Sequence, residues 1–223
     1  MYLIKTPRFM QAMFPNYTWN VKTEEKVLYL TFDDGPIPEV TPYVLDTLER
    51  YNAKATFFCV GANVEKNPSV FEQILAAGHA VGNHTFNHLN GWETDILPYF
   101  HNVRKCAHLV KSSLFRPPYG KLMPKQTQFL ARHYRIVMWD VLSGDFDSSI
   151  TKEDCLNNVL TSAKRGSIVV FHDSIKASEH MKYALPRVLE HFAARGYRFE
   201  SLENVLAKPE RKPFLAAAAM LSM

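Results

Sequence analysis

Short apolar runs alternate along the chain with longer segments whose apolar residues recur at helical spacing. The runs have the length of buried strands, and the periodic segments have the length of amphipathic helices. We expect strands at 27–32, 55–60, 79–81, 114–116, 135–141, 167–171 and 198–200. We expect helices at about 41–51, 67–77, 94–112, 123–133, 152–164 and 182–195. This alternation is typical of βα units that build a parallel sheet.

Several helix ends carry boundary signals. Gly78 and Gly196 each follow a predicted helix, where a glycine is the residue most often found in the left-handed conformation. Thr151 precedes Glu153 and Asp154, so it suits the N-cap of a helix with acidic residues in its first turn. The signals support the helix boundaries given above.

No internal repeat, low-complexity tract or Gly/Ser-rich linker interrupts the alternation. We therefore expect one main domain over 25–206, with an N-terminal extension over 1–24 that packs on it and a C-terminal tail over 207–223. The fold class is α/β, and the number of βα units favours a single-domain, distorted (β/α)7-type barrel. An open flavodoxin-like sheet is the alternative, because strand number does not show whether the sheet closes.

The composition is that of an ordinary globular protein, with 47% hydrophobic and 22% charged residues in a chain of 223. Such a chain buries a large core without disulfides. The net charge is only +4 and the sequence contains no long basic run, so we expect no nucleic-acid partner. Cys59, Cys106 and Cys155 form no CxxC motif, and we expect them to be free thiols or small buried side chains rather than zinc ligands.

We expect no targeting signal at either end of the chain. Lys5, Pro7 and Arg8 interrupt the N-terminal apolar residues, so there is no apolar stretch of about 7–15 residues as in a signal peptide. The apolar run at 214–223 is about half the length of roughly 20 residues that a membrane helix needs. We expect a short docking helix or a frayed end there, no membrane span and, by default, a cytoplasmic location.

Polar clusters follow five of the predicted strands. In a parallel barrel the carboxyl ends of the strands share one face, so we expect the clusters to converge on one site. The clusters are Asp33-Asp34-Gly35-Pro36, His84-Thr85-Phe86-Asn87-His88, Arg116-Pro117-Pro118-Tyr119-Gly120, Ser143-Gly144-Asp145 and His172-Asp173. Each cluster alone has an ordinary interpretation as a turn, a rigid connection or a pair of surface histidines.

Two of the clusters contain the groups of a metal site. Adjacent side chains on a regular strand point to opposite faces, so Asp33 and Asp34 serve one site only if strand geometry ends there, as Gly35 permits. The i, i+4 spacing of His84 and His88 places both imidazoles on one face of a helical turn. Two imidazoles and one carboxylate describe a catalytic zinc site or a non-haem iron triad.

The other clusters contain groups suited to acid–base chemistry. The two prolines that follow Arg116 make a stiff loop, which could aim the guanidinium at a carboxylate and a backbone N–H at a developing oxyanion. His172 at a strand end, with Asp145 nearby, has the composition of a tuned acid or base.

Together the clusters resemble the five motifs of the polysaccharide deacetylase family, carbohydrate esterase family 4. The motifs occur in order as TFDDGP at 31–36, HTFNH at 84–88, RPPYG at 116–120, DF at 145–146 and VVFHD at 169–173. The family includes chitin, chitooligosaccharide and peptidoglycan N-acetylglucosamine deacetylases and acetylxylan esterases. The resemblance implies a distorted barrel with fewer than eight strands and a polysaccharide deacetylase domain over 25–206.

The resemblance also implies a role for the residues that match the first three motifs. Asp34, His84 and His88 would bind a divalent metal, usually zinc, although the family also uses cobalt or nickel. Asp33 would be the general base that activates water, and Arg116 would hold and orient it.

The later matches complete the implied catalytic set. His172 would be the general acid that protonates the leaving amine, with Asp145 as its charge partner, and Tyr119 would offer its backbone N–H to the oxyanion. Many members read an acidic residue, two spacers and Asp-Trp in the fourth motif, where this chain has Leu142 and Phe146. This departure bears on the substrate range more than on the chemistry.

We therefore expect a metal-dependent hydrolase that removes acetyl groups from N-acetylated amino-sugar glycans, chitin-like or peptidoglycan-like. The partner is an acetylated glycan or oligosaccharide. An O-acetyl esterase acting on acetylxylan and a non-catalytic glycan-binding relative are the alternatives.

Overall fold

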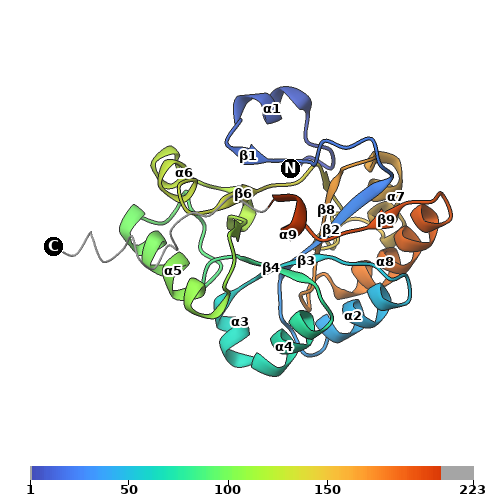
Figure 1. The fold of residues 1–223 in the computed structure, drawn as a ribbon, viewed down its shortest axis with the longest axis horizontal. Coiled ribbons are helices and arrows are strands. Elements are labelled where there is room, and N and C mark those ends of the chain that lie inside the picture. The colour runs from blue at the N-terminus through green and yellow to red at the C-terminus, as the bar shows by residue number, and fades with distance from the viewer. Residues whose placement is uncertain (1, 207–223) are drawn as a thin grey trace.

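The strands of the computed structural model, which describes residues 2–206, form one curled sheet with parallel ladders (Figure 1). The strand order is β1-β6-β5-β4-β3-β2-β8-β7, and β9 pairs with β2 outside this path. The strands are β1 (Tyr17–Thr18), β2 (Val27–Asp34), β3 (Thr56–Cys59), β4 (Ala80–Asn83), β5 (Leu114–Phe115), β6 (Arg135–Val137), β7 (Val141–Leu142), β8 (Ile168–His172) and β9 (Arg198–Phe199).

Helices cover the outside of the curled sheet, and most of them connect consecutive strands (Figure 1). They are α1 (Arg8–Met13), α2 (Thr41–Glu49), α3 (Gly61–Lys66), α4 (Pro68–Ala76), α5 (Ile96–Leu109), the 3-10 turn η1 (Pro118–Gly120), α6 (Pro124–Leu130), α7 (Lys152–Ser162), α8 (Ser178–Ala193) and α9 (Glu203–Leu206). The predicted α/β class and distorted single-domain barrel are thereby confirmed. Within residues 2–206, none of the helices is long and apolar enough to cross a bilayer.

The segment expected as one strand at 135–141 is two short strands, and that prediction was wrong. β6 pairs with β5 and β1 near one end of the strand order, whereas β7 pairs with β8 at the other end. Between them Met138 donates its N–H to Thr18 and Asp140 donates its N–H to Ile168, so the chain crosses from one edge of the sheet to the other. This crossing draws the two edges together, which an open flavodoxin-like sheet does not do.

The core explains why β2 reads as a continuous apolar run. Residues 27–33 are all buried, as in a central parallel strand that is covered on both faces. Phe32 stacks between Phe57 and Phe171, with ring centroids 5.0 and 6.0 Å away. This stacking of three phenylalanine rings fixes β2 between β3 and β8, and so fixes the position of the residues at the carboxyl end of β2.

The residues expected at three helix ends have the conformation or hydrogen bond predicted for them. Gly78 and Gly196 have φ of 72° and 76°, and the Thr151 hydroxyl accepts the N–H of Asp154 at 3.0 Å. The short α3, at residues 61–66, was missed because it follows β3 directly and has no N-cap side chain.

The N-terminal residues lie against the edges of the sheet. β1 pairs with β6, and residues 4–6 run antiparallel to the segment that contains β7. The expected tail at 207–223, including a docking helix or frayed end at 214–223, lies outside the described residues.

Candidate active site

The carboxyl end of β2 carries two adjacent carboxylates. Asp33 is only 4% exposed and lies in register with His172 of the neighbouring strand β8. Asp34 has φ of 87°, so the chain leaves strand geometry at Asp34 itself, and its carbonyl accepts a hydrogen bond from Asn63 at 2.8 Å. Both carboxylates therefore line the same cavity, which a regular strand would not allow.

Arg116 is a fully buried cation that contacts Asp33. Its Nη1 donates to Asp33 Oδ1 and to Thr31 Oγ1, both at 2.7 Å. Its Nη2 donates to the carbonyl of Met138 at 2.9 Å, and its Nε donates to that of Val137 at 3.3 Å. Because its donors have partners on β2 and at the end of β6, the guanidinium has one fixed position from which it orients the Asp33 carboxylate.

Asp34, His84 and His88 form the group suited to a metal ion. Their ligand atoms lie within 4.8 Å of one another, and Asp34 Oδ1 is 3.3 Å from His88 Nε2 and 3.9 Å from His84 Nε2. His84 Nδ1 lies 2.7 Å from the carbonyl of Arg116, so it carries the proton and leaves Nε2 free as a ligand. Burial lowers the pKa of His84 to about 4, which keeps the imidazole neutral. The donor set and its protonation therefore fit a divalent metal.

The segment that joins the two histidines is a loop and not the helical turn expected from their spacing. Thr85 and His88 have φ of 62° and 55°, a conformation that is strained for a β-branched residue such as threonine. The Asn83 amide accepts the N–H of Thr85 at 2.9 Å, and Asn102 on α5 accepts the next two N–H groups at 2.7 and 2.9 Å. These two asparagines hold the loop, and sequence reasoning assigned neither a role.

The loop that follows β5 bends at Tyr119. This residue has φ of 60°, is 61% exposed, and places its ring edge-on to the ring of His88, with centroids 4.7 Å apart. The N–H of Gly120 donates to the carbonyl of Pro117 at 3.0 Å, which tightens the turn. Tyr119 thus borders the cavity on the side of the histidine pair.

His172, at the carboxyl end of β8, forms a close pair with Asp145. Asp145 Oδ1 lies 2.7 Å from His172 Nδ1, and Oδ2 accepts the backbone N–H of His172 at 2.7 Å. Burial works against the charged imidazole, but the charge and hydrogen bond of Asp145 outweigh it and raise the pKa of His172 to about 9. His172 is consequently protonated at neutral pH, with Nε2 not engaged by Asp145.

Asp173 supports the turn after β2, a role that sequence reasoning missed. It is fully buried and accepts the N–H of Gly35 at 2.9 Å and the hydroxyl of Thr41 at 2.6 Å. Burial raises its pKa to about 7. A Cβ on Gly35 would lie 1.9 Å from Asp173 Oδ2, so only glycine allows this approach. The close contact fixes the backbone next to Asp34.

These groups surround a cavity of about 520 Å³. Arg116 and Asp145 lie behind its surface, whereas the other six residues singled out by sequence line it directly. The lining residues are Tyr2, Asp33, Asp34, His84, His88, Tyr119, Trp139, Leu142, Phe146, Val170, His172, Ser174 and Lys176. Sequence reasoning assigned no role to Trp139 or to Tyr2, and no local pattern places Tyr2 here.

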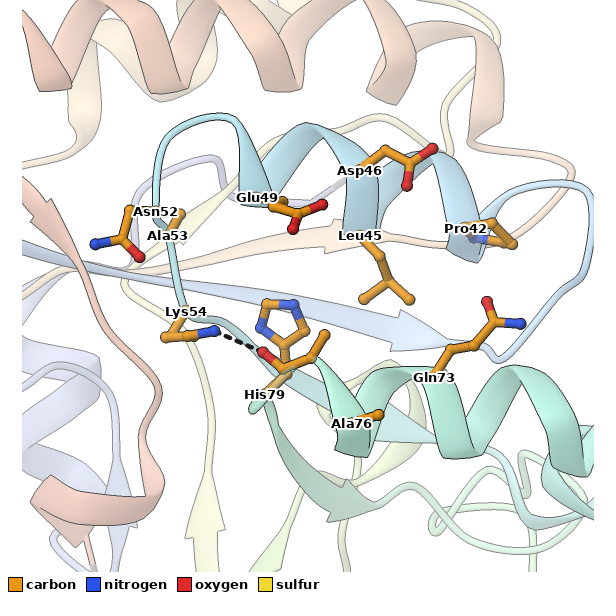
Figure 2. A pocket seen from close by; sticks show the side chains of 11 residues that line it. Pro42, Leu45, Asp46, Glu49, Asn52, Ala53, Lys54, Gln73, Ala76 and His79 are labelled. Atoms are coloured by element: carbon orange, nitrogen blue, oxygen red, sulfur yellow. Dashed lines mark hydrogen bonds between the residues drawn. The ribbon is translucent and has the colours of Figure 1, made fainter.

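A second cavity, of about 400 Å³, lies beside the starts of β3 and β4 and is bordered by α2 and α4 (Figure 2). The Lys54 amine donates to the carbonyl of Ala77 at 2.6 Å. His79 Nδ1 accepts the N–H of Ala55, and burial together with Lys54 lowers the pKa of His79 to about 4. The cavity lies at the amino ends of the strands, away from the acid–base groups.

Comparison with known proteins agrees with this architecture. The polysaccharide deacetylase family model matches residues 20–139, more than half of the chain. A peptidoglycan-N-acetylglucosamine deacetylase of Bacillus cereus is 36% identical over 198 residues, which cover 85% of this chain and 92% of that protein. A chitooligosaccharide deacetylase of Azorhizobium caulinodans is 32% identical over 203 residues, which cover 82% of this chain and 95% of that protein.

The fold is similar to that of a solved relative. The crystal structure of the Bc1960 peptidoglycan N-acetylglucosamine deacetylase has a TM-score of 0.83 and 29% sequence identity, covering 93% of this chain and 100% of that one. The family match, the curled barrel and the polar residues at its strand ends lead to one conclusion. The chain belongs to the polysaccharide deacetylase family of glycan-deacetylating enzymes.

Proposed function

We propose that the protein is a metal-dependent deacetylase of N-acetylated amino-sugar glycans, chitin-like or peptidoglycan-like. The observation that carries the proposal is the placement of a buried carboxylate, Asp33, and a protonated imidazole, His172, in register on neighbouring strands beside the Asp/His/His group. Relatives named for peptidoglycan and chitooligosaccharide deacetylation support the substrate class.

Asp34, His84 and His88 are the residues that would hold the metal, for which we propose zinc, with cobalt or nickel as alternatives. When bound there, the ion would polarise the acetyl carbonyl and make water more acidic. The His84 imidazole is neutral and its Nδ1 is hydrogen-bonded to the Arg116 carbonyl, so its Nε2 is available as a metal ligand. The loop held by Asn83 and Asn102 keeps the two imidazoles close together.

Asp33 is proposed as the general base. Its carboxylate takes a proton from water as the water oxygen forms a bond to the acetyl carbon. Arg116 holds Asp33 Oδ1 at 2.7 Å, so the carboxylate does not rotate away or reorganise during the reaction. The backbone N–H of Tyr119 is proposed to donate to the oxygen on which negative charge develops.

His172 is proposed as the general acid. An amide nitrogen leaves poorly as an anion, so a proton must reach it as the carbon–nitrogen bond breaks. Asp145 keeps His172 protonated near neutral pH, and His172 Nε2 gives that proton to the nitrogen. The products are acetic acid, which releases its proton to the solvent as acetate, and the free amine of the sugar, and the proton held by Asp33 balances the one that His172 has lost.

The first test is acetate release from a panel of chitin oligomers, peptidoglycan and acetylxylan by the metal-reconstituted protein. Asp33→Asn should lower turnover of the best substrate by about 10²- to 10⁴-fold, the contribution typical of a general base, with the metal content unchanged. Asp46→Asn is the matched control, because Asp46 is an exposed carboxylate that borders the second cavity. Wild-type turnover by a metal-loaded Asp33→Asn variant would show that the assigned base is wrong.

A further inference from the structure

Tyr2 borders the active-site cavity although it lies far from every motif in sequence. Its ring centroid is 5.1 Å from that of Phe146, with the ring planes tilted by 57°. Its hydroxyl donates to Asp147 Oδ2 at 2.7 Å. Tyr2 therefore makes two contacts with the loop that carries Asp145, one through its ring and one through its hydroxyl.

The N-terminal arm, residues 2–6, is anchored by buried groups. The N–H of Leu142 donates to the carbonyl of Ile4 at 2.8 Å, and Lys5 lies opposite β7 in an antiparallel bridge. The Lys5 amine also donates to Asp140 Oδ2 at 2.6 Å. Asp140 is 2% exposed and accepts a second hydrogen bond from the Ser167 hydroxyl at 2.6 Å. The position of Tyr2 is thus set by pairing along β7 and by the ion pair between the partly exposed Lys5 and the buried Asp140.

Tyr2 extends an aromatic surface that begins at the proposed acid. Phe146 lies edge-on to the His172 ring, with centroids 5.2 Å apart, and Tyr2 lies against the same phenyl ring. The order His172, Phe146, Tyr2 leads away from the site of proton transfer. A sugar that contacts Tyr2 is therefore a neighbour of the reacting sugar in the glycan chain.

We propose that Tyr2 is a substrate-binding residue, whose ring, beside Phe146, packs against the sugar unit next to the one that loses its acetyl group. The inference rests on the proposed function, since it assumes a glycan in the cavity. Aromatic rings give a large apolar contact area at low entropic cost, and a half-buried tyrosine can meet the C–H face of a pyranose while its hydroxyl keeps a polar partner.

The proposal distinguishes the ring of Tyr2 from its hydroxyl. If Tyr2 served only to brace the loop at 143–147 through Asp147, loss of the hydroxyl would matter as much as loss of the ring. Tyr2→Phe removes only the hydrogen bond, whereas Tyr2→Leu removes the ring and retains an apolar side chain. Phe14→Leu is the matched control, because Phe14 is an N-terminal aromatic that stacks on Tyr17 and does not line the cavity.

The experiment compares N-acetylglucosamine itself, which has no neighbouring sugar, with its pentamer, using metal-loaded protein with any tag at the C-terminus. Tyr2→Leu should raise KM for the pentamer by about 3- to 10-fold, the effect of losing one aromatic contact, and should change KM for the monosaccharide much less. Tyr2→Phe, which keeps the ring, should raise KM for the pentamer less than Tyr2→Leu does, and the Phe14→Leu control should behave as wild type. An equal effect of Tyr2→Leu on both substrates, or an equal effect of Tyr2→Phe and Tyr2→Leu, would overturn the proposal.

A binding measurement separates this inference from the proposed function. In an Asp33→Asn background, the pentamer should bind about 3- to 10-fold more weakly when Tyr2→Leu is added, as measured by calorimetry. An unchanged Kd would overturn the role of Tyr2 whether or not acetate is released. Absence of acetate release from the wild type, with the difference in Kd intact, would instead refute the proposed function alone.

Discussion

The pairing of His172 with Asp145 makes a sharp prediction about pH. Asp145→Asn removes the negative charge that raises the pKa of His172 to about 9, and it keeps a side chain of nearly the same shape. Burial lowers the pKa of this imidazole, whereas the charges of Asp34 and Asp33 raise it less strongly than Asp145 does. In the variant the pKa of His172 should therefore fall from about 9 toward its ordinary value of 6.5.

The change in protonation sets the size of the effect. At pH 7.5 a pKa of about 9 leaves about 97% of His172 protonated, whereas a pKa of 6.5 leaves about 9%. If only the protonated imidazole delivers the proton, kcat/KM should fall by up to about ten-fold at pH 7.5. The alkaline limb of the pH profile should move from near pH 9 toward pH 6.5. At pH 5.5 both proteins are mostly protonated, so their activities should converge.

Stability should follow the same titration. The pKa of folded His172 is raised above its unfolded value, so its stabilising effect is complete below about pH 6.5 and is lost as the pH rises through about 9. A pKa raised from 6.5 to about 9 corresponds to about 3 kcal/mol of unfolding free energy. Between pH 6 and pH 10 the wild type should thus lose up to about 3 kcal/mol more stability than Asp145→Asn, as measured by urea titration.

Two assays test this reasoning together. Acetate release from an N-acetylglucosamine oligomer, followed between pH 5 and 10, gives the alkaline limb of the pH profile. The two-dimensional NMR signals of the His172 ring give the pKa of His172 directly. A ratio of wild-type to variant activity that stays constant across this range would refute the assignment, as would an unchanged pKa. Asp154→Asn is a suitable control, since the exposed Asp154 carboxylate accepts the N–H and hydroxyl of Thr151 at the start of α7, away from the cavity.

The other predictions concern the buried pair and the leaving group. Arg116→Met strands the Asp33 carboxylate in the protein interior and should lower stability by about 3–5 kcal/mol, or Tm by about 6–20 °C in calorimetry. Adding Asp33→Asn should restore part of that loss, and purely additive effects would contradict the coupling. His172→Ala should reduce N-acetyl release by about 10²- to 10⁴-fold and O-acetyl release much less, because an alkoxide leaves more easily than an amide anion. Equal losses on matched N- and O-acetyl sugars would argue against His172 as the acid.

Much of the fold followed from local pattern. Apolar runs such as 27–32 and 167–171 proved to be central strands, since a strand buried on both faces must be apolar throughout. The boundaries at Gly78 and Thr151 were also correct, because capping depends on the conformation and hydrogen bonds of a few consecutive residues. The division of 135–141 into two strands was missed, since its cause is pairing with β5 and β8 and not its own composition.

The candidate site divides in the same way. The identity of its groups was evident from sequence, since parallel strands deliver their carboxyl ends to one face and polar residues follow five of them. The conformation of the loop that joins His84 and His88 was not evident, because the side chain of Asn102 on the following helix, α5, holds it. The spacing of the two histidines fits a helical turn as well as it fits the loop that the structure shows.

The residue order along the chain was enough to indicate which chemical groups meet, because βα alternation constrains where every strand ends. Only the tertiary structure decided how these groups are held. It buries Arg116 between Asp33 and the carbonyls of 137–138, packs Asp173 against Gly35, and brings Tyr2 to Phe146. These contacts join segments far apart in the chain, and their geometry depends on how the sheet curls and closes, which no local stretch of sequence encodes.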